Sequence, residues 1–261
     1  MLNPNKLRLL VLRLVYEKQS GHIGGSFSLA EIISHLYNNF DLTNSGEKSD
    51  KLVLSKGHAV PIVYAALHEL GLISDHEFSL FREINSPLQG HPDKLKLKQI
   101  HATTGSLGQG LSISIGHAIG MKVKGITKKC FCIIGDGEMQ EGQIWESLML
   151  APKYNLDNLI CIVDYNRSQN DDLTDNILSL EPLRTKIESF NWEFLSMDGH
   201  NIEEIEYIFN KASDSTNNKP KFIQANTIKG KGVSFMAENP EWHAKAPTLE
   251  EYEQACKELS C

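Results

Sequence analysis

Short apolar runs alternate with helical patterns along most of the chain. Five runs are apolar on both faces and read as buried strands: 51–55, 129–135, 158–166, 191–197 and 220–228. Between them, apolar residues recur at helical spacing, for instance over 106–123, 140–154 and 201–213. Strands alternating with helices are typical of parallel βαβ units, and strands apolar on both faces suit a sheet covered by helices on each side. The pattern predicts an α/β fold with a doubly wound, mostly parallel sheet.

The start of the chain adds an amphipathic helix to this pattern. Arg13 interrupts the apolar run there, which argues against a signal peptide. The helical spacing is carried by Leu7, Leu10, Val11, Leu14 and Val15. No repeat, linker or shift in composition marks a boundary, so we expect one domain over residues 1–261, with helical additions at its start and end. No stretch is long and apolar enough to span a bilayer.

Charge and cysteine content narrow the class of protein. The chain has 261 residues and a formal net charge of −7, and its basic residues are scattered among acids, which argues against a nucleic-acid-binding face. Its five cysteines form no C-x-x-C pair, and three of them lie inside apolar runs. This usage favours a reducing compartment without structural disulfides or a zinc site. We therefore expect a cytoplasmic protein that binds neither nucleic acid nor membrane.

Polar residues stand directly after two of the expected strands. Asp136 lies between Gly135 and Gly137 in "CFCIIGDGE", and Asn166 ends "NLICIVDYN". In open α/β sheets, ligands bind beyond the carboxyl ends of the strands. A carboxylate and an amide suit Mg²⁺ or Ca²⁺ when waters and phosphate oxygens complete the shell. The alternative is that Asp136 caps a helix and Asn166 makes a turn, and these two residues alone leave both interpretations open.

The wider sequence resembles the transketolase family of thiamine diphosphate enzymes. The run from "GDG" through an acidic helix to a strand ending in Asn is one such likeness. Five further segments resemble transketolase motifs in the family's order: "SGHIGGSFSLAEI" (20–32), "LSKGHAVPIVYAAL" (54–67), "GHPD" (90–93), "TTGSLGQGLSISIG" (103–116) and "NPEWHAKAP" (239–247). The resemblance covers nearly the whole chain, and several separated motifs in order rarely arise by chance. It implies a thiamine diphosphate-binding fold with thiamine diphosphate and Mg²⁺ or Ca²⁺ as cofactors.

The resemblance also implies which residues hold the cofactor. Asp136, Asn166 and the backbone carbonyl of Ser168 would bind the metal, and two diphosphate oxygens and a water would complete its shell. The cofactor would also be bordered by Gly135, Gly137, Glu138, Gly105, Ser106 and Leu107. "NRSQNDD" departs from the apolar residues usual after the Asn, but a carbonyl ligand does not depend on the side chain of Ser168. A glycine-rich approach to a helix also occurs for packing alone.

Four histidines lie in these motifs. Three of them follow a glycine directly, and the fourth follows a tryptophan: His22, His58, His91 and His243. A single histidine beside a loop is usually structural or solvated. The resemblance implies that these four hold sugar hydroxyls, contact the diphosphate and move protons, with His58 and His243 also at the cofactor. An imidazole suits this work because its ordinary pKa of roughly 6.5 lies near working pH.

Two carboxylates after "GDG" have an implied role between active sites. Glu141 and Glu146 are five positions apart, so their side chains point in different directions along a helix. The resemblance implies that they join a network between the active sites of an assembly. The alternative is that at least one is solvated or interacts with the helix dipole.

The resemblance implies a missing half as well. In transketolases, the activating glutamate and the aromatic residue that stacks on the cofactor ring come from a pyrimidine-binding domain, which a carboxyl-terminal domain follows. The sequence ends at Cys261, soon after "WHAKAP". We therefore expect the amino-terminal subunit of a split transketolase, which is inert by itself. Together with two copies of a carboxyl-terminal subunit, two copies of this chain would transfer a two-carbon ketol unit between sugar phosphates.

Three other functions stay open at this point. The first is a related thiamine diphosphate enzyme of a specialised pathway, acting on an unusual sugar. The second is a non-catalytic thiamine diphosphate-binding protein, against which the retained histidines argue. The third is a metal-dependent phosphohydrolase that uses Asp136 and Asn166, which would want more carboxylates around the metal.

Overall fold

A five-stranded parallel sheet forms the centre of the structure, a computed structural model that describes residues 1–260. The spatial order is β1-β2-β3-β5-β4, and every neighbouring pair is parallel. The strands are β1 (Lys51–Leu54), β2 (Cys130–Gly135), β3 (Leu159–Tyr165), β4 (Glu193–Asp198) and β5 (Lys221–Asn226). Each lies on one of the apolar runs of the sequence, although β4 begins two residues later and ends one residue later than its run. The predicted α/β fold is confirmed.

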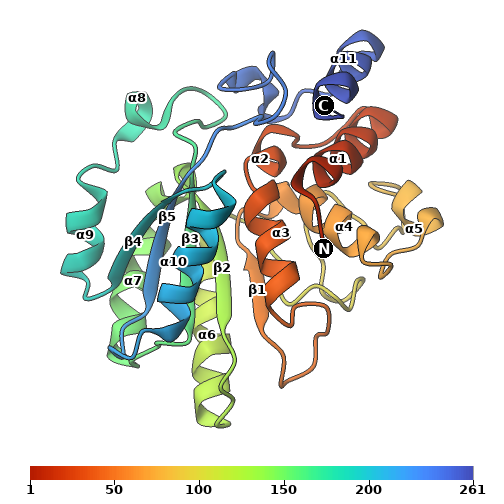
Figure 1. Cartoon of the computed structure of the whole chain (residues 1–261). Helices are drawn as coiled ribbons and strands as arrows, with labels where there is room; N and C mark the ends of the chain where they lie inside the picture. The colour runs from red at the N-terminus through yellow and green to blue at the C-terminus, as the bar shows by residue number, and fades with distance from the viewer. Residues whose placement is uncertain (261) are drawn as a thin grey trace.

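Helices cover both faces of the sheet because successive side chains of a strand point to opposite faces. On one face, Phe131 and Ile162 belong to a core shared with α1 (Pro4–Lys18), α3 (Ala30–Asn39), α4 (Val60–Glu69), α10 (Ile202–Asp214) and α11 (Leu249–Leu259). On the other face, Cys132 and Val163 pack with α6 (Gln109–Val123), α7 (Gly142–Lys153) and α9 (Leu183–Ser189). Figure 1 shows these two groups of helices on either side of the strands.

The direction of the connections explains this division. From β1 to β2, β3 and then β4 the chain moves one way across the sheet, and α6, α7 and α9 precede β2, β3 and β4 on one face. From β4 to β5 the chain steps back, and its connecting helix α10 lies on the other face. Right-handed crossovers require the helix to change face when the direction reverses. The sheet is therefore doubly wound, as predicted.

The helices at the two ends of the chain pack together. Asn3 caps α1 by accepting from the Lys6 amide at 3.1 Å, and Pro4 occupies its first turn. Thr248 and Glu251 form a capping box at the start of α11. The rings of Tyr16 and Tyr252 stack with centroids 4.2 Å apart, which joins α1 to α11. On its other side, α1 packs against α4 (Figure 1).

Short helices and turns fill the connections. They are α2 (Gly24–Phe27), α5 (Asp75–Ser79), α8 (Thr174–Leu178) and the 3₁₀ turns η1 (Gly57–Ala59), η2 (Gly137–Gln140) and η3 (Pro240–His243). A 3₁₀ turn therefore stands where the sequence predicted the start of the helix over 140–154, and α7 begins only at Gly142. Cys130, Cys132, Cys161 and Cys256 are free thiols, and Cys261 lies outside the described residues.

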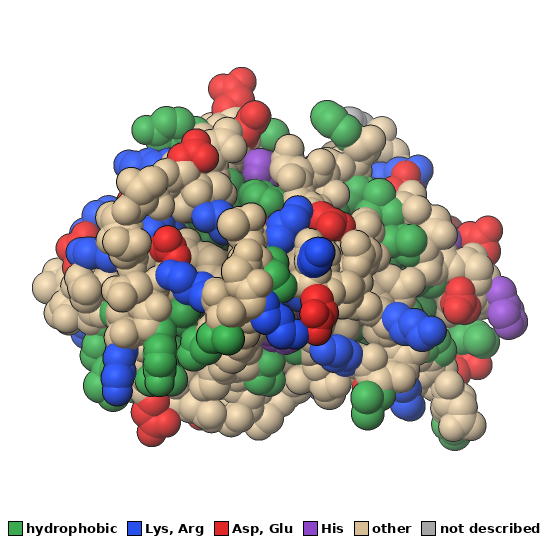
Figure 2. Space-filling view, turned by 90° about the horizontal axis from the view of Figure 1, so that it is seen from below, with side chains coloured by type: hydrophobic (Ala, Val, Ile, Leu, Met, Phe, Trp, Pro, Cys, Tyr) green, Lys and Arg blue, Asp and Glu red, His purple; other side chains and the backbone are tan. Residues whose placement is uncertain are grey.

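The face at the amino ends of the strands has mixed charge. Figure 2 shows Lys and Arg side chains interspersed with Asp and Glu on this face. Ion pairs there include Lys124–Glu47 and Lys122–Asp157. None of the helices among residues 1–260 has the length and apolar character needed to cross a membrane.

Candidate active site

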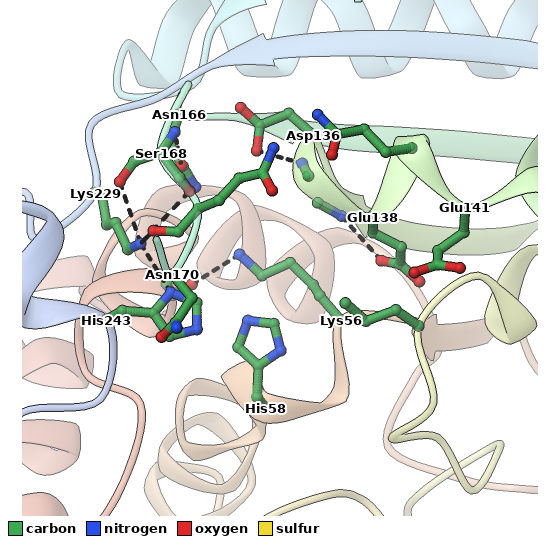
Figure 3. A pocket seen from close by; sticks show the side chains of 16 residues that line it. Lys56, His58, Asp136, Glu138, Glu141, Asn166, Ser168, Asn170, Lys229 and His243 are labelled. Atoms are coloured by element: carbon green, nitrogen blue, oxygen red, sulfur yellow. Dashed lines mark hydrogen bonds between the residues drawn. The ribbon is translucent and has the colours of Figure 1, made fainter. Parts of the chain in front are cut away.

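A cavity of about 300 Å³ opens at the carboxyl ends of the strands. The segments after β1, β2, β3 and β5 line it, together with α2 and η3. It brings together ten of the residues that the sequence singled out: His58, Leu107, Gly135, Asp136, Gly137, Glu138, Glu141, Asn166, Ser168 and His243. Figure 3 shows Asp136, Asn166 and Ser168 on one side of the cavity and His58 and His243 on the other, with Lys56 and Lys229 between them.

Asp136, Asn166 and Ser168 form what we call the oxygen wall. Gly135 pairs with Asp164 in the register of β2 and β3, so Asp136 and Asn166 follow neighbouring strand ends. The buried Asp136 carboxylate accepts from the Gly137 amide at 2.8 Å and from the Arg167 amide at 2.6 Å. Burial, helped by the charge of Asp164, raises the pKa of Asp136 to about 6. Neighbouring strands thus place an uncompensated carboxylate on the cavity wall.

Behind this wall lies a buried network centred on Asp164. The Asp164 carboxylate forms an ion pair with Lys56 and accepts from Ser28 at 2.7 Å and from Asn166 at 3.0 Å. It also accepts a hydrogen bond from Thr227. Burial alone would raise the pKa of Asp164, but the Lys56 ammonium and these donors hold it below its ordinary value. The network fixes Asn166 and ties the ends of β1, β3 and β5 to the segment after α2.

A second lysine joins the two sides of the cavity. Lys229, in the segment after β5, donates to the Ser168 hydroxyl at 3.2 Å and the Gln169 carbonyl at 3.1 Å. Its ammonium also lies 2.8 Å from Nδ1 of His243. Burial and the nearby charge of Lys56 lower the pKa of Lys229 to about 8. The amine faces both oxygen ligands and an imidazole.

His22, His58 and His243 form what we call the imidazole wall; His58 and His243 line the cavity, and the ring of His22 packs against both without lining it. Their ring centroids lie 5.1 to 5.3 Å apart in all three pairs. Burial first, and then neighbouring cations, lower the pKa of His22 to about 4, of His58 to about 2 and of His243 to about 3. The three rings are therefore neutral near pH 7, and each offers one N–H donor and one acceptor nitrogen. Nδ1 of His22 is buried and makes no hydrogen bond within the described chain.

His91 lies apart from these three rings. Its side chain stands against Gly105, where a Cβ would lie 3.5 Å from the His91 ring. His91 is exposed and does not line the cavity, although its charge would act on His22. The structure thus brings three of the four predicted histidines into contact and leaves the fourth beside the glycine-rich turn.

Glu138 fixes the glycine-rich turn rather than facing the cavity with free oxygens. Its carboxylate accepts from the Gly108 amide at 2.8 Å, from the Gly135 amide at 3.0 Å and from the Ser55 hydroxyl. Gly108 has φ of +84°, a left-handed conformation that favours glycine. A Cβ at Gly110 would clash with Ser55. The turn 105–110 is thus held between β1 and the end of β2.

The other predicted residues differ in how closely they approach the cavity. Gly105 and Ser106 do not line it, although the next residue, Leu107, does. Glu141 lines it and is exposed, whereas Glu146 is exposed on α7 and does not line it. Neither of these two glutamates forms an ion pair with another residue of the described chain. Their carboxylates are free to meet groups outside this chain.

Sequence reasoning missed six residues of the cavity lining and the aspartate at the centre of the network behind it. They are Lys56, Lys229, Asp164, Gly25, Gln140, Gln169 and Asn170. Two features of the sequence indicate the three charged residues among them. Lys56 and Lys229 each stand beside a glycine just after a strand, and Asp164 interrupts an apolar run. A charge inside a buried strand requires a counter-ion, but the sequence does not say which lysine supplies it.

Comparisons with known proteins show that this chain is similar to transketolases. Residues 2–260 match the family described as "Transketolase, thiamine diphosphate binding domain". The chain is 38% identical over 265 residues to one of the named subunits of apulose-4-phosphate transketolase from Phocaeicola vulgatus, with 99% of this chain and 93% of that protein covered. It is 40% identical over 259 residues to 6-deoxy-6-sulfo-D-fructose transketolase subunit SqwG of a Clostridium species, with 98% and 94% covered.

A solved structure agrees in fold. The transketolase of Campylobacter jejuni superposes with a TM-score of 0.92 at 31% sequence identity. The match covers 98% of this chain and 42% of the solved one. The chain therefore spans about two fifths of the length of that solved transketolase.

Proposed function

This chain belongs to the transketolase family, and we propose that it is the amino-terminal subunit of a split transketolase. In this proposal, residues 1–261 are one diphosphate-binding domain that acts with a second polypeptide to transfer a two-carbon ketol unit between sugar phosphates. The observation that carries it is the cavity itself, where an oxygen wall and an imidazole wall face each other across two ammonium groups. Such a cavity suits a ligand with an anionic end and a hydroxyl-bearing partner.

The oxygen wall fits a divalent cation bound together with a diphosphate. Asp136 is 2% exposed and forms no ion pair within residues 1–260, so its charge lacks a direct partner. No group of three or more His, Cys, Asp or Glu in that part of the chain is arranged to hold a metal. A cation would therefore take Asp136, Asn166 and the Ser168 carbonyl from the protein and its other oxygens from the ligand. Hard oxygen donors of this kind suit Mg²⁺ or Ca²⁺.

Lys56 and Lys229 supply positive charge where the diphosphate would lie. Both ammonium groups line the cavity and are buried. Lys229 donates to neutral oxygens of Ser168 and Gln169 rather than to a carboxylate. An anionic ligand would give this ammonium a counter-charge, which the two neutral oxygens do not supply.

The imidazole wall suits the sugar end of the reaction. When bound, thiamine diphosphate supplies the carbanion-stabilising chemistry of ketol transfer. A neutral imidazole can donate to one hydroxyl and accept from another; in His243 the acceptor Nδ1 already faces the Lys229 ammonium, which leaves its other nitrogen as a donor. Such groups hold a sugar in position and pass a proton at a ring nitrogen. His58 and His243 line the cavity, whereas His22 packs against them and has a buried Nδ1 that makes no hydrogen bond within the described chain.

Several observations support a partner polypeptide. Two relatives that this chain covers almost completely carry "subunit" in their names. Apolar side chains stay exposed around the cavity mouth and on α7 and α8, among them Leu107, Leu150, Tyr154, Ile177 and Leu178, and patches of this kind are usually covered by a partner. We propose that the partner carries the pyrimidine-binding and carboxyl-terminal domains and that two copies of each chain assemble with two-fold symmetry. Glu141 and Glu146 would then meet groups across the assembly.

The substrate and compartment are further parts of the proposal. The two relatives are named for different sugars, apulose 4-phosphate and 6-deoxy-6-sulfo-D-fructose. A sugar of a specialised pathway is thus the second candidate beside common sugar phosphates. Four free thiols fit a reducing cytoplasm.

The test is reconstitution. The full chain is purified alone and together with the polypeptide encoded beside its gene, and two-carbon transfer is assayed between sugar phosphates with thiamine diphosphate and Mg²⁺. We expect transfer only from the mixture. Robust transfer by the full chain alone would contradict the split enzyme, because the activating carboxylate would then lie within these residues.

A further inference from the structure

A chain of buried polar contacts connects the first helix of the protein to the cavity from behind. Arg8 of α1 donates to Glu31 of α3 at 2.7 Å and to the Phe27 carbonyl at 3.0 Å. The same Glu31 oxygen lies 3.0 Å from Nδ1 of His200, in the turn between β4 and α10. Nε2 of His200 lies 2.8 Å from the backbone nitrogen of Ile228. Ile228 directly precedes Lys229.

The partners of His200 define its tautomer. The Ile228 backbone can only donate, so Nε2 of His200 must be the acceptor and carry no hydrogen. The hydrogen then lies on Nδ1 and is donated to Glu31. Burial by itself would raise the pKa of Glu31, but the hydrogen bond from His200 and the nearby Arg8 bring it below its ordinary value. The carboxylate is therefore ionised and able to accept from both.

The segment held in this way carries two cavity contacts. Thr227, on one side of Ile228, donates to Asp164. Lys229, on the other side, reaches Ser168, Gln169 and His243. The Ile228 amide thus fixes the backbone between Thr227 and Lys229. Its acceptor, His200, comes from a different connection, the turn between β4 and α10.

We infer that His200 is a positioning residue, which fixes Lys229 for the diphosphate end of the ligand by accepting from the Ile228 amide. His200 does not line the cavity, and its ring hydrogen-bonds to Glu31 and Ile228, neither of which is a proposed metal ligand. The inference rests on the proposed function for the identity of the ligand, but the hydrogen bond itself belongs to the chain. Arg8 and Glu31 act through His200 by holding its ring in the required tautomer.

Two substitutions separate the two hydrogen bonds of the ring. In His200→Gln, the side-chain carbonyl can take the place of Nε2 and accept from Ile228. In His200→Asn, the shorter amide can take the place of Nδ1 and donate to Glu31, but it does not reach Ile228. His35→Asn is the matched control, because His35 is also buried on this face of the sheet, against Phe209, and lies away from the cavity.

The experiment uses the full chain and two measurements. The first is amide hydrogen exchange at Ile228 and Lys229 without ligand, with thermal unfolding recorded in parallel. We expect His200→Asn to speed exchange at Ile228 by about threefold to tenfold, the loss of one hydrogen bond, while His200→Gln and His35→Asn stay near the parent chain. The second is calorimetric titration of thiamine diphosphate with Mg²⁺ into the chain reconstituted with its partner polypeptide, where we expect His200→Asn to weaken binding by about tenfold or more.

The outcomes are distinguishable. The inference is overturned if the Asn and Gln variants show the same exchange at Ile228 and the same affinity for thiamine diphosphate. If both variants match the parent chain, His200 has no effect. If both are impaired to the same extent, His200 has only a structural role. If the parent chain reconstituted with its partner polypeptide binds no thiamine diphosphate, the proposed function fails, while exchange at Ile228 in the chain alone still decides whether His200 holds the segment.

Discussion

The two walls of the cavity are built in opposite ways. The oxygen wall follows neighbouring strand ends, and its side chains are already engaged: Asp136 accepts from the Arg167 amide, Asn166 donates to Asp164 and accepts from the Ser168 amide, and the Ser168 hydroxyl accepts from Lys229. The imidazole wall stands on the segment before α2 and on the 3₁₀ turns η1 and η3, and it includes a ring nitrogen without a partner in the described chain. The sheet thus holds the oxygen wall in place before any ligand binds. The imidazole wall comes from connecting segments and has a ring nitrogen without a hydrogen-bond partner in the described chain.

This difference suggests a division of work. Strand ends give fixed positions, which suits the binding of a cation and a diphosphate that stay in place through many turnovers. Rings on connecting segments, neutral near pH 7, suit a sugar that must enter, react and leave. Lys56 and Lys229 lie between the walls, and each contacts groups from more than one connection.

The largest effect is expected on turnover when the imidazole wall is changed. His22→Asn and His243→Asn in the reconstituted enzyme should lower kcat by about a hundredfold to ten-thousandfold, because general acid and base groups contribute that much. Affinity for thiamine diphosphate should change far less. Steady-state kinetics and calorimetry measure the two quantities. His76→Asn, at an exposed position on α5, is the control, and parent-like kcat in both wall variants would remove the division of work.

Between the walls, loss of Lys56 should act on stability. Lys56→Met leaves the buried Asp164 carboxylate without its ion pair, so the free energy of unfolding should fall by about 3–5 kcal/mol. Urea denaturation of the full chain measures it. The double variant Lys56→Met with Asp164→Asn removes both charges and should recover much of the loss. If the double variant is no more stable than the single one, the ion pair is not the cause.

At the oxygen wall, removal of one charge should separate binding from stability. Asp136→Asn should weaken Mg²⁺-dependent binding of thiamine diphosphate by at least about a hundredfold, because a metal ligand should matter at least as much as the groups that orient it. The ligand-free chain should be as stable as the parent or more so, since a buried charge without an ion pair is costly. Calorimetry and urea denaturation test both, with the exposed Asp171→Asn as control. Unchanged affinity would remove the metal assignment.

The smallest effect is expected from pH, and it belongs to the imidazole wall. The pKa of His22 is lowered from 6.5 to about 4 by burial and by Arg82, His91 and Lys229. As pH falls from 6.5 towards 4, the unfolded chain binds a proton at His22 that the folded chain does not, so the free energy of unfolding falls.

His22→Asn should remove about 1 kcal/mol of this fall after allowance for solvent screening. The comparison with the parent chain is needed because the pKa of His101, away from the cavity, is lowered to about 4 as well and contributes to the same trend. Denaturation curves at pH 7, 6, 5 and 4.5 give the difference. Identical pH profiles for the two chains would mean that His22 titrates normally in the folded state.

The parallel sheet and one of the two walls could be predicted from the amino-acid sequence. Parallel strands apolar on both faces can be recognised in the chain because each is a continuous run, and residues that follow such runs must gather at the same edge. The local pattern therefore allowed Asp136 and Asn166 to converge if their strands were neighbours, and the pairing of β2 with β3 shows that they are. The motif resemblance then supplied the histidines and the family.

Which charges meet could be seen only in the folded chain. Lys56 and Asp164 are 108 positions apart, and Lys229 reaches Ser168 across 61; no local pattern fixes such pairs, since any buried carboxylate accepts any lysine within reach. The same holds for His91, which shares a motif type with His22 and His58 but lies against Gly105 outside their cluster. Likewise, the sequence offered His200 no role, because its partners come from α3 and the segment after β5 and meet only when the sheet brings those connections together.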